Sequence, residues 1–165
     1  MPFTVRRPAE PVATCSLLDA GIFIGALLRG DPRHQEARAL VESARCGDLP
    51  ACTTMGILCE VYGAVTWEGA RPPHDPAVAA EVVRALIEPP SAIRVLEEGP
   101  EVILPALELA VAHHLTARRI HDARHAAAAL LADVRSVYTY DIHDWRPFEE
   151  HGLIIAGPPS VLLVR

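Results

Sequence analysis

Short apolar runs alternate along this chain with longer segments in which apolar residues recur every three or four positions. The short runs predict strands that are buried on both faces, at residues 13–18, 51–53, 93–96, 136–139 and 153–156. The longer segments predict helices, at residues 21–28, 34–45, 54–65, 77–87, 100–114 and 122–132. Because strands alternate with helices, we expect a three-layer α/β/α sandwich with a mainly parallel central sheet.

Four acidic residues interrupt or bound these apolar elements: Asp19, Glu60, Asp122 and Asp141. An ionised carboxylate beside Leu, Ile and Val costs several kcal/mol unless something compensates its charge. One hard divalent cation, such as Mg2+ or Mn2+, compensates several carboxylates at once. Two of the four acids follow expected strands, so they belong at the sheet edge where parallel α/β folds bind ligands. The four acids therefore predict a metal site at that edge.

Composition limits the alternatives. The chain has 165 residues, of which half are hydrophobic and 22% are charged, which indicates a single folded domain over 1–165. The formal charge of −6 argues against a broad basic face for nucleic acid. Four cysteines without a CxxC pair indicate neither a zinc ribbon nor a disulfide scaffold. The sequence suggests no signal peptide and no membrane-spanning segment, so we expect a cytoplasmic protein.

The contexts of the four acids resemble those of the PIN-domain ribonucleases, and among them the VapC-type toxins of bacterial toxin-antitoxin pairs. The stretches that carry the resemblance are LLDAGIFIGALL, ACTTMGILCEVYGAV, RIHDARHAAAALL and VYTYDIHDWRPF. The resemblance implies a PIN-like fold and a metal-dependent endoribonuclease, in which Asp19, Glu60, Asp122 and Asp141 bind Mg2+ or Mn2+ and a metal-activated water hydrolyses RNA. It also implies a PIN-like core at about residues 13–159, an RNA substrate, a cognate antitoxin protein and a homodimer.

The resemblance adds further candidates around the four acids. Asp144 occupies a second acidic position of the stretch TYDIHDW and is a further candidate metal ligand. Thr139 and Thr53 resemble hydroxyl residues that lie beside the acids in that family. Arg118, Arg119 and Arg124 cluster around the third acid, and Arg6 and Arg7 precede the first strand. These arginines are candidates for contact with RNA phosphates.

Two alternative functions remain open from the sequence. The family often has Ser or Asn two places after the first acid, where this chain has Gly21, so the chain could be a PIN-like interaction module without efficient metal binding. The segment HDARH places His121 and His125 on one helical face, as in the HExxH motif of zinc hydrolases. The Glu of that motif is an Asp here and no third zinc ligand is evident, which disfavours the zinc interpretation.

Overall fold

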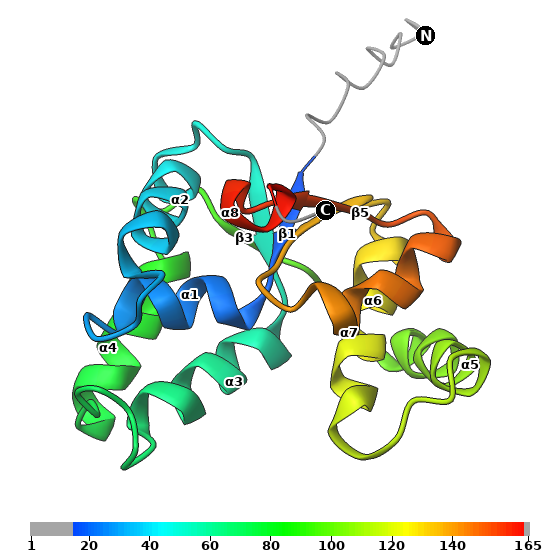
Figure 1. The fold of residues 1–165 in the computed structure, drawn as a ribbon, viewed down its shortest axis with the longest axis horizontal. Helices are drawn as coiled ribbons and strands as arrows, with labels where there is room; N and C mark the ends of the chain where they lie inside the picture. Colours follow the sequence, from blue (N-terminus) through cyan, green and yellow to red (C-terminus); the bar gives the residue numbers. More distant parts are fainter. Residues whose placement is uncertain (1–14, 164–165) are drawn as a thin grey trace, which may run out of the picture.

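The computed structural model describes residues 15–163 and is built on a five-stranded sheet in which every strand pair is parallel (Figure 1). The sheet order is β3-β2-β1-β4-β5. The strands are β1 (Ser16–Leu18), β2 (Ala51–Thr53), β3 (Arg94–Val95), β4 (Ser136–Tyr138) and β5 (Ile154–Gly157). The expected start of the first strand at residues 13 and 14 lies outside the described residues, as do Arg6 and Arg7.

The helices form two layers, one on each side of the sheet (Figure 1). The first layer contains α1 (Ala20–Leu27), α2 (His34–Cys46), α3 (Met55–Thr66) and α4 (Pro76–Ile87). The second contains α5 (Ile103–Ala112), α6 (Ile120–Leu131) and α7 (Ile142–Trp145). Three 3-10 turns, η1 (Pro100–Val102), η2 (Ala117–Arg119) and η3 (Arg146–His151), and the short helix α8 (Pro159–Leu162) complete the described chain. The predicted three-layer α/β/α sandwich is confirmed.

The order of the strands opens a crevice between β1 and β4. From β1 the chain moves through β2 to β3 in one direction, and it then returns across the sheet to place β4 on the other side of β1. In such folds the ligand crevice lies at the carboxyl ends of the two strands where the direction reverses. Asp19 directly follows β1, and its backbone N–H donates to the carbonyl oxygen of Tyr138 at the end of β4, at 3.1 Å. The fold thus brings residue 19 beside residues 139–141.

Small side chains allow the second helical layer to pack closely. Alanines that are all buried line α6: Ala123, Ala126, Ala127, Ala128 and Ala129. Since a methyl group occupies little volume, α6 packs tightly against the sheet and α5. Trp145 and Phe148 are almost completely buried beside this layer and meet edge to face, with ring centroids 5.8 Å apart. This packing fixes the end of α7 next to the crevice.

The segment 100–114 differs from its prediction as a single helix. A 3-10 turn over Pro100–Val102 comes first, and α5 ends at Ala112. The chain leaves the helix because His114 adopts a left-handed conformation with φ 51°. Pro105 lies in the first turn of α5, where its missing N–H would have no helical acceptor. Among residues 15–163, no helix combines the length and the apolar character needed to cross a membrane.

Candidate active site

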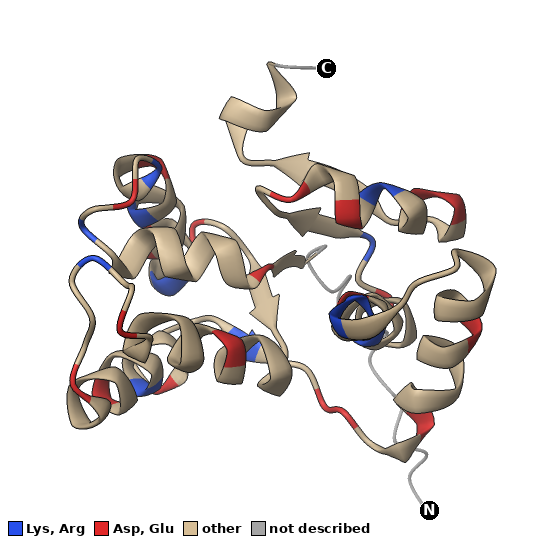
Figure 2. Ribbon diagram, turned by 60° about the horizontal axis from the view of Figure 1, so that its bottom comes forward, with Lys and Arg blue, Asp and Glu red and all other residues tan. Residues whose placement is uncertain are grey.

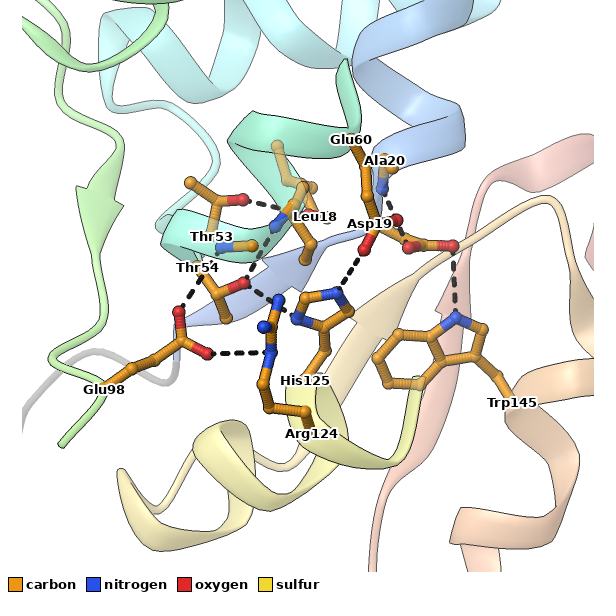
Figure 3. Close-up of polar contacts among 12 residues, drawn as sticks. Leu18, Asp19, Ala20, Thr53, Thr54, Glu60, Glu98, Arg124, His125 and Trp145 are labelled. Carbon is orange, nitrogen blue, oxygen red and sulfur yellow. Dashed lines mark hydrogen bonds and ion pairs between the residues drawn. The ribbon is translucent and has the colours of Figure 1, made fainter. Parts of the chain in front are cut away.

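Asp19 is held in place by three donors at the start of α1. Its Oδ1 accepts from the backbone N–H of Ala20 at 2.8 Å, as an N-cap. Its Oδ2 accepts from the Thr139 hydroxyl at 2.7 Å and from the indole N–H of Trp145 at 3.1 Å. Burial raises the pKa of Asp19, and these three hydrogen bonds partly oppose the rise. Figure 3 shows the carboxylate between Ala20 and Trp145, so its direction is fixed by elements from both helical layers.

Glu60 is positioned by a chain of hydrogen bonds that runs from α3 to α6 and whose other members, His125 and Thr54, are fully buried (Figure 3). Its Oε1 lies 2.8 Å from Nε2 of His125, and Nδ1 of His125 lies 2.9 Å from Oγ1 of Thr54. Because an ionised carboxylate only accepts, Nε2 of His125 carries a proton and donates it. Thr54 Oγ1 also accepts from the backbone N–H of Ile57 at 3.1 Å, as the N-cap of α3. Burial opposes ionisation of Glu60, but His125 and neighbouring positive charges lower its pKa overall.

The raised pKa of Asp122 is the clearest indication that several acids lie near one another. It lies in the first turn of α6 and is partly buried. Burial and then the charges of Asp19, Asp144, Glu60 and Asp141 raise the pKa of Asp122 to about 7. All of the predicted metal-binding acids therefore act electrostatically on this one carboxyl group. A divalent cation would offset that excess of negative charge.

Asp141 caps the short helix α7. Its Oδ1 accepts from the backbone N–H of Asp144 at 3.4 Å, and its own N–H donates to Thr139 Oγ1 at 2.9 Å. Thr139 therefore donates to the first acid and accepts from the fourth. This threonine, which the family resemblance singled out, connects the ends of β1 and β4. Thr53, the other expected hydroxyl residue, instead donates to the carbonyl oxygen of Leu18 at 3.4 Å.

One cavity joins the four acids. Its volume is 460 Å³, and Asp19, Glu60, Asp122 and Asp141 all line it. The donor set consists of carboxylate oxygens, which suit hard cations such as Mg2+ and Mn2+. As the side chains lie, no three acidic, imidazole or thiol groups among residues 15–163 are arranged to bind one ion together. Like charges repel, so we expect such carboxylates to lie apart when no cation is bound between them.

Two of the candidate arginines and Asp144 are engaged in ion pairs. Nη2 of Arg119 lies 3.0 Å from Oδ1 of Asp144, which ties the start of α6 to α7. Nε of Arg124 lies 3.6 Å from Oε1 of Glu98, in the loop after β3. Arg118 is exposed in η2. Figure 2 shows the basic positions of residues 15–163 spread over several elements and mixed with acidic ones.

Sequence reasoning missed the roles of two aromatic residues at the cavity. The sequence alone assigned no role to Trp145, yet a buried indole N–H needs an acceptor, and that rule could have suggested its bond to an acid. Tyr140 lines the cavity, with the guanidinium of Arg33 stacked over its ring at 4.6 Å from the centroid. Arg33 lines the same cavity from the start of α2. No sequence pattern indicated this contact, because it joins residues more than 100 positions apart.

The geometry disfavours the zinc interpretation of HDARH. His125 is fully buried, and both of its ring nitrogens are within hydrogen-bond distance of Thr54 or Glu60. His121, by contrast, is exposed. A zinc ion would have to displace the Glu60 carboxylate or the Thr54 hydroxyl from His125. The histidine therefore acts as a support for Glu60.

Comparisons with known proteins agree with this fold. A family model described as the PIN domain matches residues 16–146, a range that includes all four acids. The crystal structure of VapC20 from Mycobacterium tuberculosis, a toxin that cleaves the sarcin-ricin loop, matches with a TM-score of 0.64 and 22% identity. The match covers 86% of this chain and 98% of that chain. No curated protein matches the chain in a sequence search. Because the family model spans most of its residues, the chain belongs to the PIN domain family.

Proposed function

We propose that this protein is a metal-dependent endoribonuclease, the toxin of a type II toxin-antitoxin pair. The main support is the single cavity at the β1/β4 crevice whose wall includes Asp19, Glu60, Asp122 and Asp141. VapC20, which shares the fold, is a toxin that cleaves the sarcin-ricin loop. A shared fold does not specify the substrate, so the RNA that this protein cleaves is left open.

In this proposal the four acids hold Mg2+ or Mn2+, and Asp144 is an additional candidate. A bound dication would lower the pKa of a water molecule and stabilise negative charge on the phosphoryl oxygens. The chain's own residues set the direction of the ligands. Thr139 and Trp145 orient Asp19, and His125 orients Glu60. Hydrogen bonds of this kind fix the direction of carboxylate ligands in metal sites.

The partners in this proposal are an RNA, an antitoxin protein and a second copy of the chain. Arg118, Arg119 and Arg124 are candidates for phosphate contact on the α6 side of the cavity. An antitoxin peptide that placed an Arg or Lys among the carboxylates would compensate their charge as a cation does, and would block the site. Paired toxins commonly have two-fold symmetry, as most homodimers do.

The test is RNA cleavage by purified protein with Mg2+ or Mn2+, with and without EDTA. Asp19→Asn preserves the shape of the side chain and removes its charge, so we expect cleavage to fall by about 100- to 1,000-fold. Asp133→Asn is the matched control, since Asp133 is exposed at the turn after α6 and its contact is with Arg135. Cleavage that persists equally in EDTA or in Asp19→Asn would contradict the proposal.

A second experiment tests the toxin role. The protein is expressed in a bacterial host with and without the small open reading frame next to its gene, and RNA ends are mapped. When the protein is expressed alone, we expect growth arrest and new RNA ends. When the neighbouring reading frame is expressed with it, we expect neither. If the purified protein neither cleaves RNA nor binds Mn2+ in a way that depends on Glu60 and Asp122, the interaction-module interpretation would replace this one.

A further inference from the structure

A second cavity adjoins the acidic one, and the two share Glu60. Its volume is 630 Å³, within the range of about 300–1,000 Å³ that is typical of small-ligand sites. Apolar side chains form much of its wall: Met55, Cys59, Val102 and Ile103. Polar side chains of α6 and of the loop after β3 face the same space: Glu98, His121 and Arg124.

The Arg124–Glu98 pair in this wall has unused hydrogen-bonding groups. The side chain of Glu98 is only 9% exposed, and its Oε1 is buried without a hydrogen-bond partner. The nearest cation, Nε of Arg124, is 3.6 Å away and is itself buried without a hydrogen-bond partner. The other oxygen of Glu98 accepts weakly from the backbone N–H of Gly56 at 3.4 Å. Buried groups left unpaired in this way are uncommon in folded proteins, and a ligand that pairs with them gains affinity.

Glycine at position 56 makes room for the arginine. A Cβ atom built on Gly56 would overlap the terminal nitrogen of Arg124 and would lie 2.6 Å from its Cζ. The guanidinium therefore lies directly on the backbone of α3, between Glu98 and the Thr54–His125 pair (Figure 3). This contact fixes Arg124 beside the carboxylate and at the edge of the cavity.

We propose that this second cavity binds a guanine base of the RNA, next to the bond that is cleaved. The inference rests on the proposed ribonuclease function and specifies what the site selects. The Watson–Crick edge of guanine has an acceptor, O6, beside two donors, N1–H and the N2 amino group. In this proposal Arg124 donates to O6 of the base and not to a phosphate, while Glu98 accepts from N1–H or N2–H. The apolar side chains cover the faces of an unstacked base, as in other single-strand RNA sites.

The same pair disfavours adenine. At the matching positions adenine has a donor, the N6 amino group, and an acceptor, N1. Adenine would therefore place a donor against the guanidinium and an acceptor against the carboxylate. Such a reversed pairing leaves buried polar groups unsatisfied, and this mismatch is how binding sites achieve strong discrimination.

The first test measures base binding without cleavage or metal. Cys59 lines the cavity and is exposed, so its alkylation by N-ethylmaleimide reports occupancy. We expect guanosine 5′-monophosphate to slow alkylation of Cys59 by about fivefold or more, and adenosine 5′-monophosphate at the same concentration to have little effect. Cys46, exposed at the end of α2, is the internal control and should react at the same rate throughout. Equal protection by both nucleotides, or protection by neither, would overturn the proposal.

Variants assign the selectivity to the pair. Glu98→Gln should remove the protection by guanosine 5′-monophosphate, whereas Glu97→Gln, a change at the exposed neighbouring acid, should retain it. Cleavage-site mapping on an RNA pool of random sequence should give guanine beside the cleaved bond. Glu98→Gln should reduce the preference for guanine over adenine by about 10- to 100-fold. Wild-type cleavage without any preference for guanine would contradict the proposal.

The two tests separate this inference from the ribonuclease proposal. If the wild type cleaves no RNA while guanosine 5′-monophosphate still protects Cys59 selectively, the proposed function fails and the base site stands. If RNA is cleaved and Cys59 is never protected, the base site fails and the ribonuclease stands. Should Glu98→Gln not fold, the comparison of the two nucleotides on the wild type still decides.

Discussion

The two cavities that meet at Glu60 differ in how their polar groups are satisfied. In the acidic cavity, three donors hold the carboxylate of Asp19, and His125 holds that of Glu60. In the neighbouring cavity, Glu98 Oε1 and Arg124 Nε are buried without hydrogen-bond partners. Hydrogen bonds thus hold two carboxylates of the first cavity in place, whereas two polar groups of the second cavity have no hydrogen-bond partner. The difference fits our proposals that RNA is hydrolysed in the acidic cavity and that the second cavity selects the base.

The two cavities also lie at different places in the fold. The acidic cavity lies at the crevice between β1 and β4, where loops from both halves of the sheet supply its residues. The second cavity lies between α3, η1, α6 and the loop that follows β3. Because Glu60 belongs to both walls, a base bound in the second cavity would lie close to the carboxylates.

His125 bonds to Glu60, the residue that lines both cavities, so we expect its substitution to have the largest effect on stability. In His125→Ala a fully buried side chain is removed, and Thr54 and Glu60 lose their partner. We expect the free energy of unfolding, measured by urea denaturation, to fall by about 2–4 kcal/mol. His121→Ala, at an exposed position on the same helix, should change it by less than about 0.5 kcal/mol. Equal effects of the two substitutions would show that the buried chain does not support Glu60.

Asp122 should make stability depend on pH when no metal is present. Its pKa is raised from 3.8 to about 7, so the folded protein holds this proton more tightly than the unfolded chain does. Between those two values the unfolding free energy, measured in EDTA, should therefore fall as the pH rises, and the loss is complete above about 7. Asp19, whose pKa is also raised, adds to the fall.

Asp122→Asn removes the ionisable group, and with it the fall in unfolding free energy that comes from ionising Asp122. After allowance for solvent screening, we expect the variant to be more stable than the wild type at pH 7.5 by about 1 kcal/mol, with little difference at pH 4. Asp133→Asn, at an exposed position, should match the wild type at both pH values. The electrostatic account would be wrong if Asp122→Asn retained the full pH dependence.

Substitution of Gly21, which lines the acidic cavity, should have the smallest effect on the free energy of unfolding. A Cβ atom at this position would lie 3.8 Å from Cδ2 of Tyr140, an ordinary contact, so Ser fits. Since Ser is the better helix former, Gly21→Ser should raise the unfolding free energy by about 0.5 kcal/mol. At Gly25 in the same helix, a Cβ atom would lie 3.1 Å from that of Ala37, so Gly25→Ser should instead destabilise the protein. Thermal unfolding of both variants checks the difference, and destabilisation by Gly21→Ser would contradict it.

The sequence predicted the sheet, the layers and the acids because these leave local signals. Buried strands are apolar runs, and Asp19 interrupts such a run at the end of β1. The contacts that orient the acids leave no such signal. Trp145 reaches Asp19 across 126 positions, and Glu98 comes beside Arg124 only through the packing of the loop after β3 against α6. Arg119 was a plausible phosphate contact in sequence, but it forms an ion pair with Asp144 in the fold.

Helix boundaries were predicted where caps mark them and missed where backbone geometry decides them. The helix expected at residues 54–65 begins next to Thr54, a residue type that favours N-caps, and Thr54 accepts from the backbone N–H of Ile57 in that role. The end of α5 depends on the left-handed conformation of His114, which no residue type at that position announces. The short helix α8 was not predicted at all. It is held to α2 by bonds from the Ser160 backbone and hydroxyl to Glu36, a contact across 124 positions.

The central claim, that four separate acids serve one cation site, is tested most directly by calorimetric titration of Mn2+ into the purified protein and its variants. We expect the wild type to bind Mn2+, and Asp19→Asn, Glu60→Gln, Asp122→Asn and Asp141→Asn each to bind it at least about tenfold more weakly. Asp133→Asn should bind as the wild type does. A wild type that does not bind Mn2+, or binding that is unchanged in all four variants, would contradict the account.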